Sequence, residues 1–102
     1  GICAGMQVIS AIYGGAAVPC PAIGLTEIQI LRESPLLGEP RSLEVYQLHN
    51  HAATLPQGFS LIAGSSDAAL AFQHPCLPTF GLLFHPEVRC RWILERFAKL
   101  PA

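Results

Sequence analysis

Apolar side chains recur at helical spacing near both ends of the chain. The first such stretch predicts a helix over residues 4–13 that ends at Gly14-Gly15, because glycine is common just past a helix C-terminus. The last stretch, residues 91–100, predicts an amphipathic helix. The apolar positions are Met6, Ile9, Ile12 and Tyr13 in the first pattern and Trp92, Ile93, Phe97 and Leu100 in the second.

Between these stretches the pattern changes to that of strands. Ile28 and Ile30 alternate with polar neighbours, which predicts a half-buried strand over residues 25–31. The preceding stretch, residues 16–21, is predicted to be a loop that its two prolines hold extended. Further strands are predicted at 43–48, 59–63, 68–73 and 80–84, with turns at 34–40 and 55–58. The order of helix, strands and helix indicates an α/β fold.

Composition narrows the class of protein. The chain has 102 residues, of which 51% are hydrophobic and 13% charged, with a formal net charge of −1. This length fits one domain, and the charge is about half that of an average soluble domain. The six basic residues form no cluster, which argues against binding of nucleic acid or a membrane surface. No apolar run approaches the roughly 18 residues of a membrane span. High apolarity and a start without Met indicate an excerpt of a larger protein.

The cysteines indicate a reducing, cytoplasmic setting, because the four lack the spacing of a zinc ribbon or a redox pair. Cys20, Cys76 and Cys90 are interpreted as free thiols. A zinc site built from them with His74 is the weaker alternative, since metal ligands usually cluster locally in sequence. Two disulfide bonds among the four cysteines are also a possible interpretation. We therefore predict no metal site.

The opening five residues place a cysteine between two glycines. Gly1, Cys3 and Gly5 form the thiol version of a nucleophile elbow, a tight turn from a strand into a helix. The helix N-terminus favours the thiolate of Cys3, and the amide of Ala4 can stabilise an oxyanion. The alternative is a glycine-containing helix start with a buried cysteine.

A second candidate follows the last predicted strand. Pro86 disfavours a helical conformation for His85, so the segment is predicted to be extended, with His85 and Glu87 on the same side. The carboxylate could then accept the ring N–H and leave the other nitrogen as a base. Alone, this segment could equally be a surface turn. Together with Cys3 it supplies nucleophile, base and orienting group.

These residues carry a family resemblance that covers essentially the whole chain. The sequence resembles the class I (triad) glutamine amidotransferases, and its motifs look most like the amidotransferase part of GMP synthase. The matching segments are Gly1-Ile2-Cys3-Ala4-Gly5-Met6-Gln7, Val45-Tyr46-Gln47-Leu48-His49, Leu55-Pro56-Gln57-Gly58-Phe59, Ile62-Ala63-Gly64-Ser65-Ser66 and Phe84-His85-Pro86-Glu87.

The resemblance implies a mechanism. Cys3 would attack the side-chain amide carbon of glutamine, His85 would move the proton to the leaving ammonia, and Glu87 would orient His85. Water would hydrolyse the resulting thioester to glutamate, and the ammonia would pass to a synthetase domain or subunit, such as that of GMP synthase. No cofactor is implied. The substrate glutamine would contact Gln7 and the backbone around His49, Asn50 and His51.

The resemblance also implies a fold, and it leaves alternatives. The expected architecture is the C-terminal half, residues 1–102, of a three-layer flavodoxin-like α/β domain with a mixed sheet. Without the other half, and its second oxyanion amide, the isolated chain is expected to be weakly active or inactive. Leu83 and His51 replace residues common in the family. They support a catalytically silent regulatory or binding module as the alternative. Hydrolysis of γ-glutamyl peptides is another, against which Gln7 argues.

Overall fold

The computed structural model describes residues 1–101, which form one curved sheet and two helices. None of the helices in this range is long and apolar enough to cross a membrane. Along the chain, the elements are α1 (Ala4–Ile12), β1 (Ala17–Ile30), β2 (Arg41–Ala53), β3 (Ser60–Gly64), β4 (Ala69–Gln73), β5 (Phe80–Leu82) and α2 (Trp92–Ala98). All the predicted helices and strands are therefore found, but β1 begins eight residues before the predicted strand and β2 ends five residues after its predicted end.

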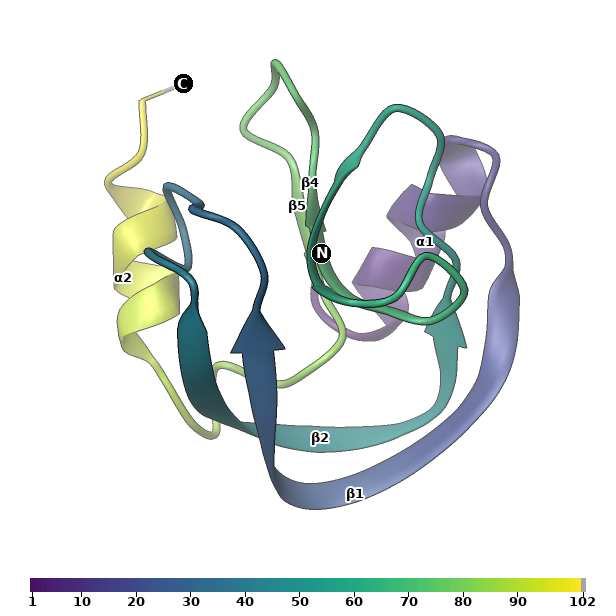
Figure 1. Cartoon of the computed structure of the whole chain (residues 1–102), viewed down its shortest axis with the longest axis horizontal. Coiled ribbons are helices and arrows are strands. Elements are labelled where there is room, and N and C mark those ends of the chain that lie inside the picture. Colours follow the sequence, from purple (N-terminus) through teal and green to yellow (C-terminus); the bar gives the residue numbers. More distant parts are fainter. Residues whose placement is uncertain (102) are drawn as a thin grey trace.

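The sheet is dominated by a long ribbon of β1 and β2 that curves around the other strands (Figure 1). The strand order is β1-β2-β4-β3, and β5, which lies outside this order, also pairs with β4. Every pair of named strands is antiparallel. β2 meets β4 at the single register pair Ala53 and Ala69. Most of the second edge of β2 is thus left for other contacts, and the functional candidates lie there.

The prediction of a loop over residues 16–21 is wrong, because this stretch is the first part of β1. The prolines do hold it extended, but it also pairs with β2, with Ala17 opposite Ala53 and Pro19 opposite His51. Proline lacks the N–H that a central strand needs, and β1 lies at an edge of the sheet. A register shift between Pro19 and Ala22 absorbs the irregularity.

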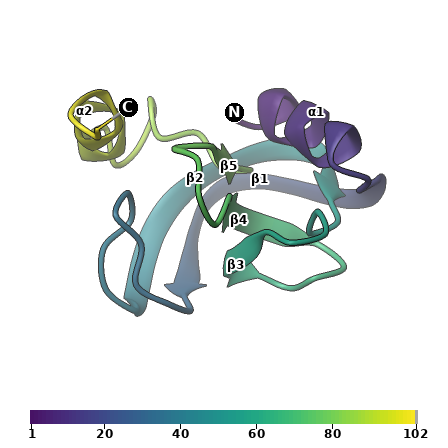
Figure 2. The same ribbon diagram turned by 90° about the horizontal axis from the view of Figure 1, so that it is seen from above.

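The two helices lie at opposite ends of the molecule (Figures 1 and 2). α1 contributes Met6 to one apolar cluster, together with Phe72 and Leu83, whereas α2 contributes Ile93 to a second cluster. Two features of the helical patterns differ from expectation. Ile12 is 72% exposed, and Ser10 takes the buried place one turn after Met6, where its hydroxyl donates to the carbonyl oxygen of Thr54.

The three expected layers are not all seen in residues 1–101. Instead, two helices accompany a curled, mostly antiparallel sheet. The parallel part of the expected mixed sheet is reduced to a bridge between Ile2 and Leu82. Two hydrogen bonds form this bridge: the amide of Leu82 donates to the carbonyl oxygen of Gly1, and the amide of Cys3 donates to that of Leu82. The chain therefore enters the Cys3 turn as a short parallel strand beside β5.

Candidate active site

Cys3 lies in a strained turn between this short strand and α1. Its φ of 52° and ψ of −107° fall outside the small left-handed region that L-residues tolerate. The amide of Cys3 is held 2.7 Å from the carbonyl oxygen of Leu82, and its own carbonyl accepts from the amide of Gln7 in the first turn of α1. The strand and the helix thus hold Cys3 from both sides in an unfavourable conformation, which is typical of functional sites.

The two glycines that flank Cys3 have different reasons to be glycine. A Cβ atom on Gly1 would lie 2.5 Å from the carbonyl carbon and oxygen of Gly5, which are backbone atoms that cannot move aside. A Cβ atom on Gly5 would meet nothing within 4 Å. Crowding around the turn therefore requires a glycine at Gly1, whereas the described residues impose no such requirement at Gly5.

His85 and Glu87 form a hydrogen-bonded pair. Nδ1 of His85 lies 2.9 Å from Oε2 of Glu87, and the Glu87 side chain is half exposed. The predicted extended backbone is wrong, because the chain turns after His85: the amides of Val88 and Arg89 both donate to the His85 carbonyl oxygen. The turn brings the carboxylate to the ring by a different route from the one expected. Since a carboxylate can only accept, Nδ1 carries the proton in this bond.

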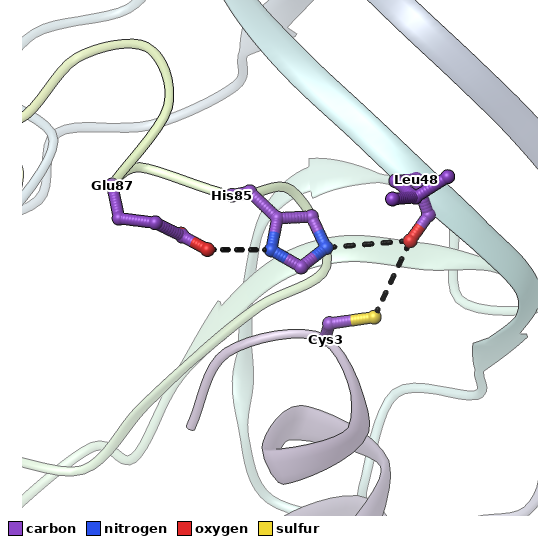
Figure 3. Close-up of polar contacts among 4 residues, drawn as sticks. All are labelled: Cys3, Leu48, His85 and Glu87. Atoms are coloured by element: carbon purple, nitrogen blue, oxygen red, sulfur yellow. Dashed lines mark hydrogen bonds and ion pairs between the residues drawn. The ribbon is translucent and has the colours of Figure 1, made fainter.

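The free edge of β2 brings Cys3 and His85 together. The amide of His85 donates to the carbonyl oxygen of Tyr46 at 2.8 Å. Two residues further along, the carbonyl oxygen of Leu48 lies 3.7 Å from Cys3 Sγ and 3.3 Å from His85 Nε2 (Figure 3). Alternate carbonyls of a strand point to the same edge. One strand edge therefore fixes the imidazole and presents a shared acceptor to both side chains.

This shared oxygen suits a proton that moves between sulfur and nitrogen. A carbonyl oxygen accepts hydrogen bonds and cannot donate them. When Cys3 is a thiol, its S–H can donate to the Leu48 oxygen. When the proton has passed to Nε2 of His85, the new N–H can donate to the same oxygen. The arrangement thus offers an acceptor to the proton in both states.

The predicted substrate residues lie around this centre in different ways. Ala4 is the exposed first residue of α1. The side-chain amide of Gln7 donates to the carbonyl oxygen of His51 at 3.1 Å, which ties α1 to the end of β2. Asn50 and His51 are exposed on β2 next to Leu48. His49 differs, because its ring is buried.

His49 pairs with Gln47 on the buried face of β2. The two side chains are 8% and 6% exposed, and His49 Nε2 lies 2.7 Å from Gln47 Oε1. Because an amide oxygen only accepts, Nε2 carries the proton. The other ring nitrogen, Nδ1, is buried without a hydrogen-bond partner among residues 1–101. The His49 ring is therefore a buried polar group beside the site.

The other residues singled out in the sequence lie outside this centre. Leu83 is fully buried in the cluster that holds Met6, so its difference from the family affects packing. Within the described part of the chain, no group of three or more His, Cys, Asp or Glu side chains is placed to hold a metal ion, and the alternative zinc site is therefore not assembled. His74 caps a turn, with Nδ1 accepting from the amides of Cys76 and Leu77.

Two contributors were missed because they act through backbone carbonyls. Leu48 and Tyr46 have side chains that carry no chemistry of the expected kind, and every residue has a carbonyl. The only signal available was the strand period, which places positions 46 and 48 on the same edge. Which edge faces Cys3 depends on how β2 meets the rest of the sheet, and the sequence pattern does not reveal that.

Comparison with known proteins places this geometry in context. Residues 1–93 match the family model described as glutamine amidotransferase class-I. One subunit of the glutamine-hydrolysing GMP synthase of Thermococcus kodakarensis is 40% identical over 93 residues, a match that covers 86% of this chain and 50% of the relative. The corresponding subunit of the Pyrococcus abyssi enzyme is 38% identical and is matched over 98% of this chain and 58% of its own length. The chain thus spans about half the length of these relatives.

The fold agrees with that of a solved relative. The crystal structure of a protein assigned as a GMP synthase subunit from Thermoplasma acidophilum superposes with a TM-score of 0.84 at 31% sequence identity. The superposition covers 95% of this chain and 53% of that chain. The curled sheet with its two helices therefore corresponds to part of a larger known architecture.

Proposed function

Since the chain belongs to the class I glutamine amidotransferase family, we propose that it carries the glutaminase centre of such an enzyme. Cys3 is the nucleophile, His85 the base and then the acid, and Glu87 the group that orients His85. The observation that carries this proposal is the meeting of Cys3 and His85 at one carbonyl oxygen, with Glu87 bonded to the far side of the ring.

The chemistry proceeds in two stages. His85 Nε2 takes the thiol proton while Sγ bonds to the side-chain amide carbon of glutamine. The C–N bond then breaks, and the proton leaves with the nitrogen as ammonia. His85 Nε2 then takes a proton from a water molecule, which attacks the thioester carbon. The C–S bond breaks, glutamate is released, and the proton on Nε2 returns to the sulfur to restore the thiol. The amide of Ala4 serves as one oxyanion donor.

Polar groups close to Cys3 support free glutamine as the substrate. The backbone from Leu48 to His51 offers polar groups beside Cys3 for the amino-acid end, and Gln7 already contacts that segment through the His51 carbonyl. The family departures leave the three proposed catalytic groups in place, since Leu83 lies in the core and the His51 side chain is exposed. This favours an active centre over the silent module.

The proposal extends to the ammonia and to the fold of the complete domain. The two curated relatives reported above are named as glutamine-hydrolysing GMP synthase subunits. We assign the ammonia to a synthetase of that type, as another domain or subunit. Residues 1–102 then form part of a three-layer domain, and the remaining strands and the second oxyanion donor come from the part of the relatives that this chain does not match.

The test is glutamate release from glutamine by the complete gene product that carries this chain. We expect glutamate and ammonia in equal amounts, and, with hydroxylamine added, γ-glutamyl hydroxamate from capture of the thioester. Cys3→Ser should lower the rate by a factor on the order of 10⁴ or more, as expected for loss of a nucleophile. The matched control is Cys90→Ser, another cysteine with positive φ, which should leave the rate unchanged. Full activity in Cys3→Ser would reject the proposal.

A further inference from the structure

We propose that the buried pair of Gln47 and His49 positions the Leu48 carbonyl between Cys3 and His85. The inference rests on the glutaminase function proposed above. Gln47 and His49 are positioning residues, since they act through Leu48.

The geometry of β2 places the pair next to the Leu48 carbonyl. Val45, Gln47 and His49 alternate along the strand and are buried on the same face. Leu48 lies between the members of the polar pair, with its side chain 48% exposed. The Leu48 carbonyl and the His49 nitrogen belong to one planar peptide group. The hydrogen bond to Gln47 holds the His49 ring, and pairing with β1 holds its backbone. Together they restrict the direction of the Leu48 oxygen.

The polar pair adds little to stability. The net contribution of a buried hydrogen bond is small, and replacing both partners by apolar groups of similar shape can be neutral or stabilising. The pair also leaves His49 Nδ1 buried without a partner among the described residues, which costs free energy. Stability alone therefore gives little reason for a polar pair here. Its 2.7 Å bond does hold the strand in one conformation where two catalytic side chains share an acceptor.

His49 has no direct role at the reacting atoms. The Nε2 atom of His49 is occupied by Gln47, and the ring is more than nine-tenths buried. The base proposed for the reaction, His85, already has the carboxylate partner that fixes its tautomer. His49 thus affects the site through the strand to which it belongs.

The variants that test this inference separate position from stability. The double variant Gln47→Met with His49→Leu replaces the pair by apolar side chains of similar size, so we expect equal or higher thermal stability. His49→Gln keeps a donor nitrogen at about the reach of Nε2, whereas His49→Asn does not. Val45→Ala is the matched control, because it opens a cavity on the same face of β2 and lowers stability without touching the pair.

The measurement is alkylation of Cys3 in the complete chain, followed by peptide mass spectrometry so that each cysteine is scored separately. One probe is a glutamine analogue with a chloromethyl ketone in place of the amide, and the other is iodoacetamide across a range of pH. In the double variant and in His49→Asn, the chloromethyl ketone should react about tenfold to a hundredfold more slowly, and the iodoacetamide pH profile of Cys3 should shift. His49→Gln and Val45→Ala should keep the wild-type rate and profile.

The outcomes distinguish this inference from the proposed function. If wild-type Cys3 reacts with the chloromethyl ketone no faster than the exposed Cys76 does, the glutaminase centre is rejected, and the positioning role with it. If wild-type Cys3 reacts fast and the double variant reacts equally fast, the positioning role alone is overturned. It is also overturned if Val45→Ala slows the reaction as much as His49→Asn does.

Discussion

Cys3 and Cys90 are the two non-glycine residues with positive φ in the described part of the chain, at 52° and 74°. Both thiols lie against carbonyl oxygens of β2, Cys3 at Leu48 and Cys90 at Glu44, and both precede a helix. Their surroundings differ. Beside Cys3 the neighbouring groups are His85 and Glu87, whereas beside Cys90 they are an ion pair of Arg89 with Glu44. The two cysteines thus share backbone strain and a carbonyl contact on β2, and the adjacent histidine, the proposed base, is found beside Cys3 alone.

Changing one carboxylate beside each cysteine should have the largest and most unequal effects. Glu87→Gln removes the acceptor that orients His85, so we expect glutamate release by the complete gene product to fall by about 10²–10⁴ in kcat, by analogy with a triad that loses its orienting acid. Glu44→Gln weakens only the exposed pair with Arg89. That change should cost at most about 1 kcal/mol of stability and leave kcat unaltered. Equal losses in both variants would contradict the distinction.

The next test concerns the turn that strains Cys3. Gly1→Ala introduces a Cβ atom against the backbone of Gly5 and Met6, so the free energy of unfolding should fall by about 1–3 kcal/mol. Alkylation of Cys3 by the glutamine-like chloromethyl ketone should slow in parallel. Gly5→Ala is the control, because its Cβ atom meets nothing and it favours the helix by up to about 1 kcal/mol. Urea denaturation measures the free energy of unfolding of both variants. A Gly5→Ala variant less stable than the unsubstituted chain would contradict the prediction.

A smaller effect comes from the strain itself. At Cys90, glycine should give a chain more stable than alanine by about 1–2 kcal/mol, because glycine alone adopts positive φ without cost. The same pair of substitutions at Cys3 should differ by at least as much, since its ψ of −107° lies further from the allowed region. Comparing the four variants by thermal unfolding tests this order. Alanine as stable as glycine at Cys3 would show that the turn is not strained.

The smallest expected effect is a pH dependence of the 102-residue chain on its own, in which the Gly1 ammonium donates to the carbonyl oxygen of Phe80 at 2.7 Å. Partial burial lowers the pKa of this ammonium below its ordinary value. Between the lowered pKa of the folded chain and the ordinary pKa of the unfolded chain, the unfolded chain binds more protons. The free energy of unfolding should therefore rise as the pH increases through this window and decrease as the pH falls through it. Denaturation of the 102-residue chain at several pH values measures the slope. N-terminal acetylation removes the ammonium and should flatten it, and an unchanged slope would contradict the assignment.

Much of the fold could be predicted because it follows from local patterns. The alternation of Ile28 and Ile30 with polar residues is independent of any partner, and both isoleucines are buried in β1. The glycine pair after the first helix and the apolar stretch of the last one located α1 and α2 to within a few residues. The strand over residues 17–24 was missed, because prolines are compatible both with a loop and with an edge strand, and only the partner strand distinguishes the two.

For the site, the sequence alone determined which side chains are available: a cysteine between glycines, and a histidine two residues before a glutamate. Their spacing in the family motifs sufficed to predict a triad whose catalytic roles stay a prediction. Only the tertiary structure decided that the edge of β2 carries the Leu48 oxygen to both Cys3 and His85, and that Gln47 and His49 are buried behind it. The physical reason is that backbone carbonyls are identical in every residue. Their direction and neighbours depend on contacts between segments that lie 45 and 37 residues apart along the chain.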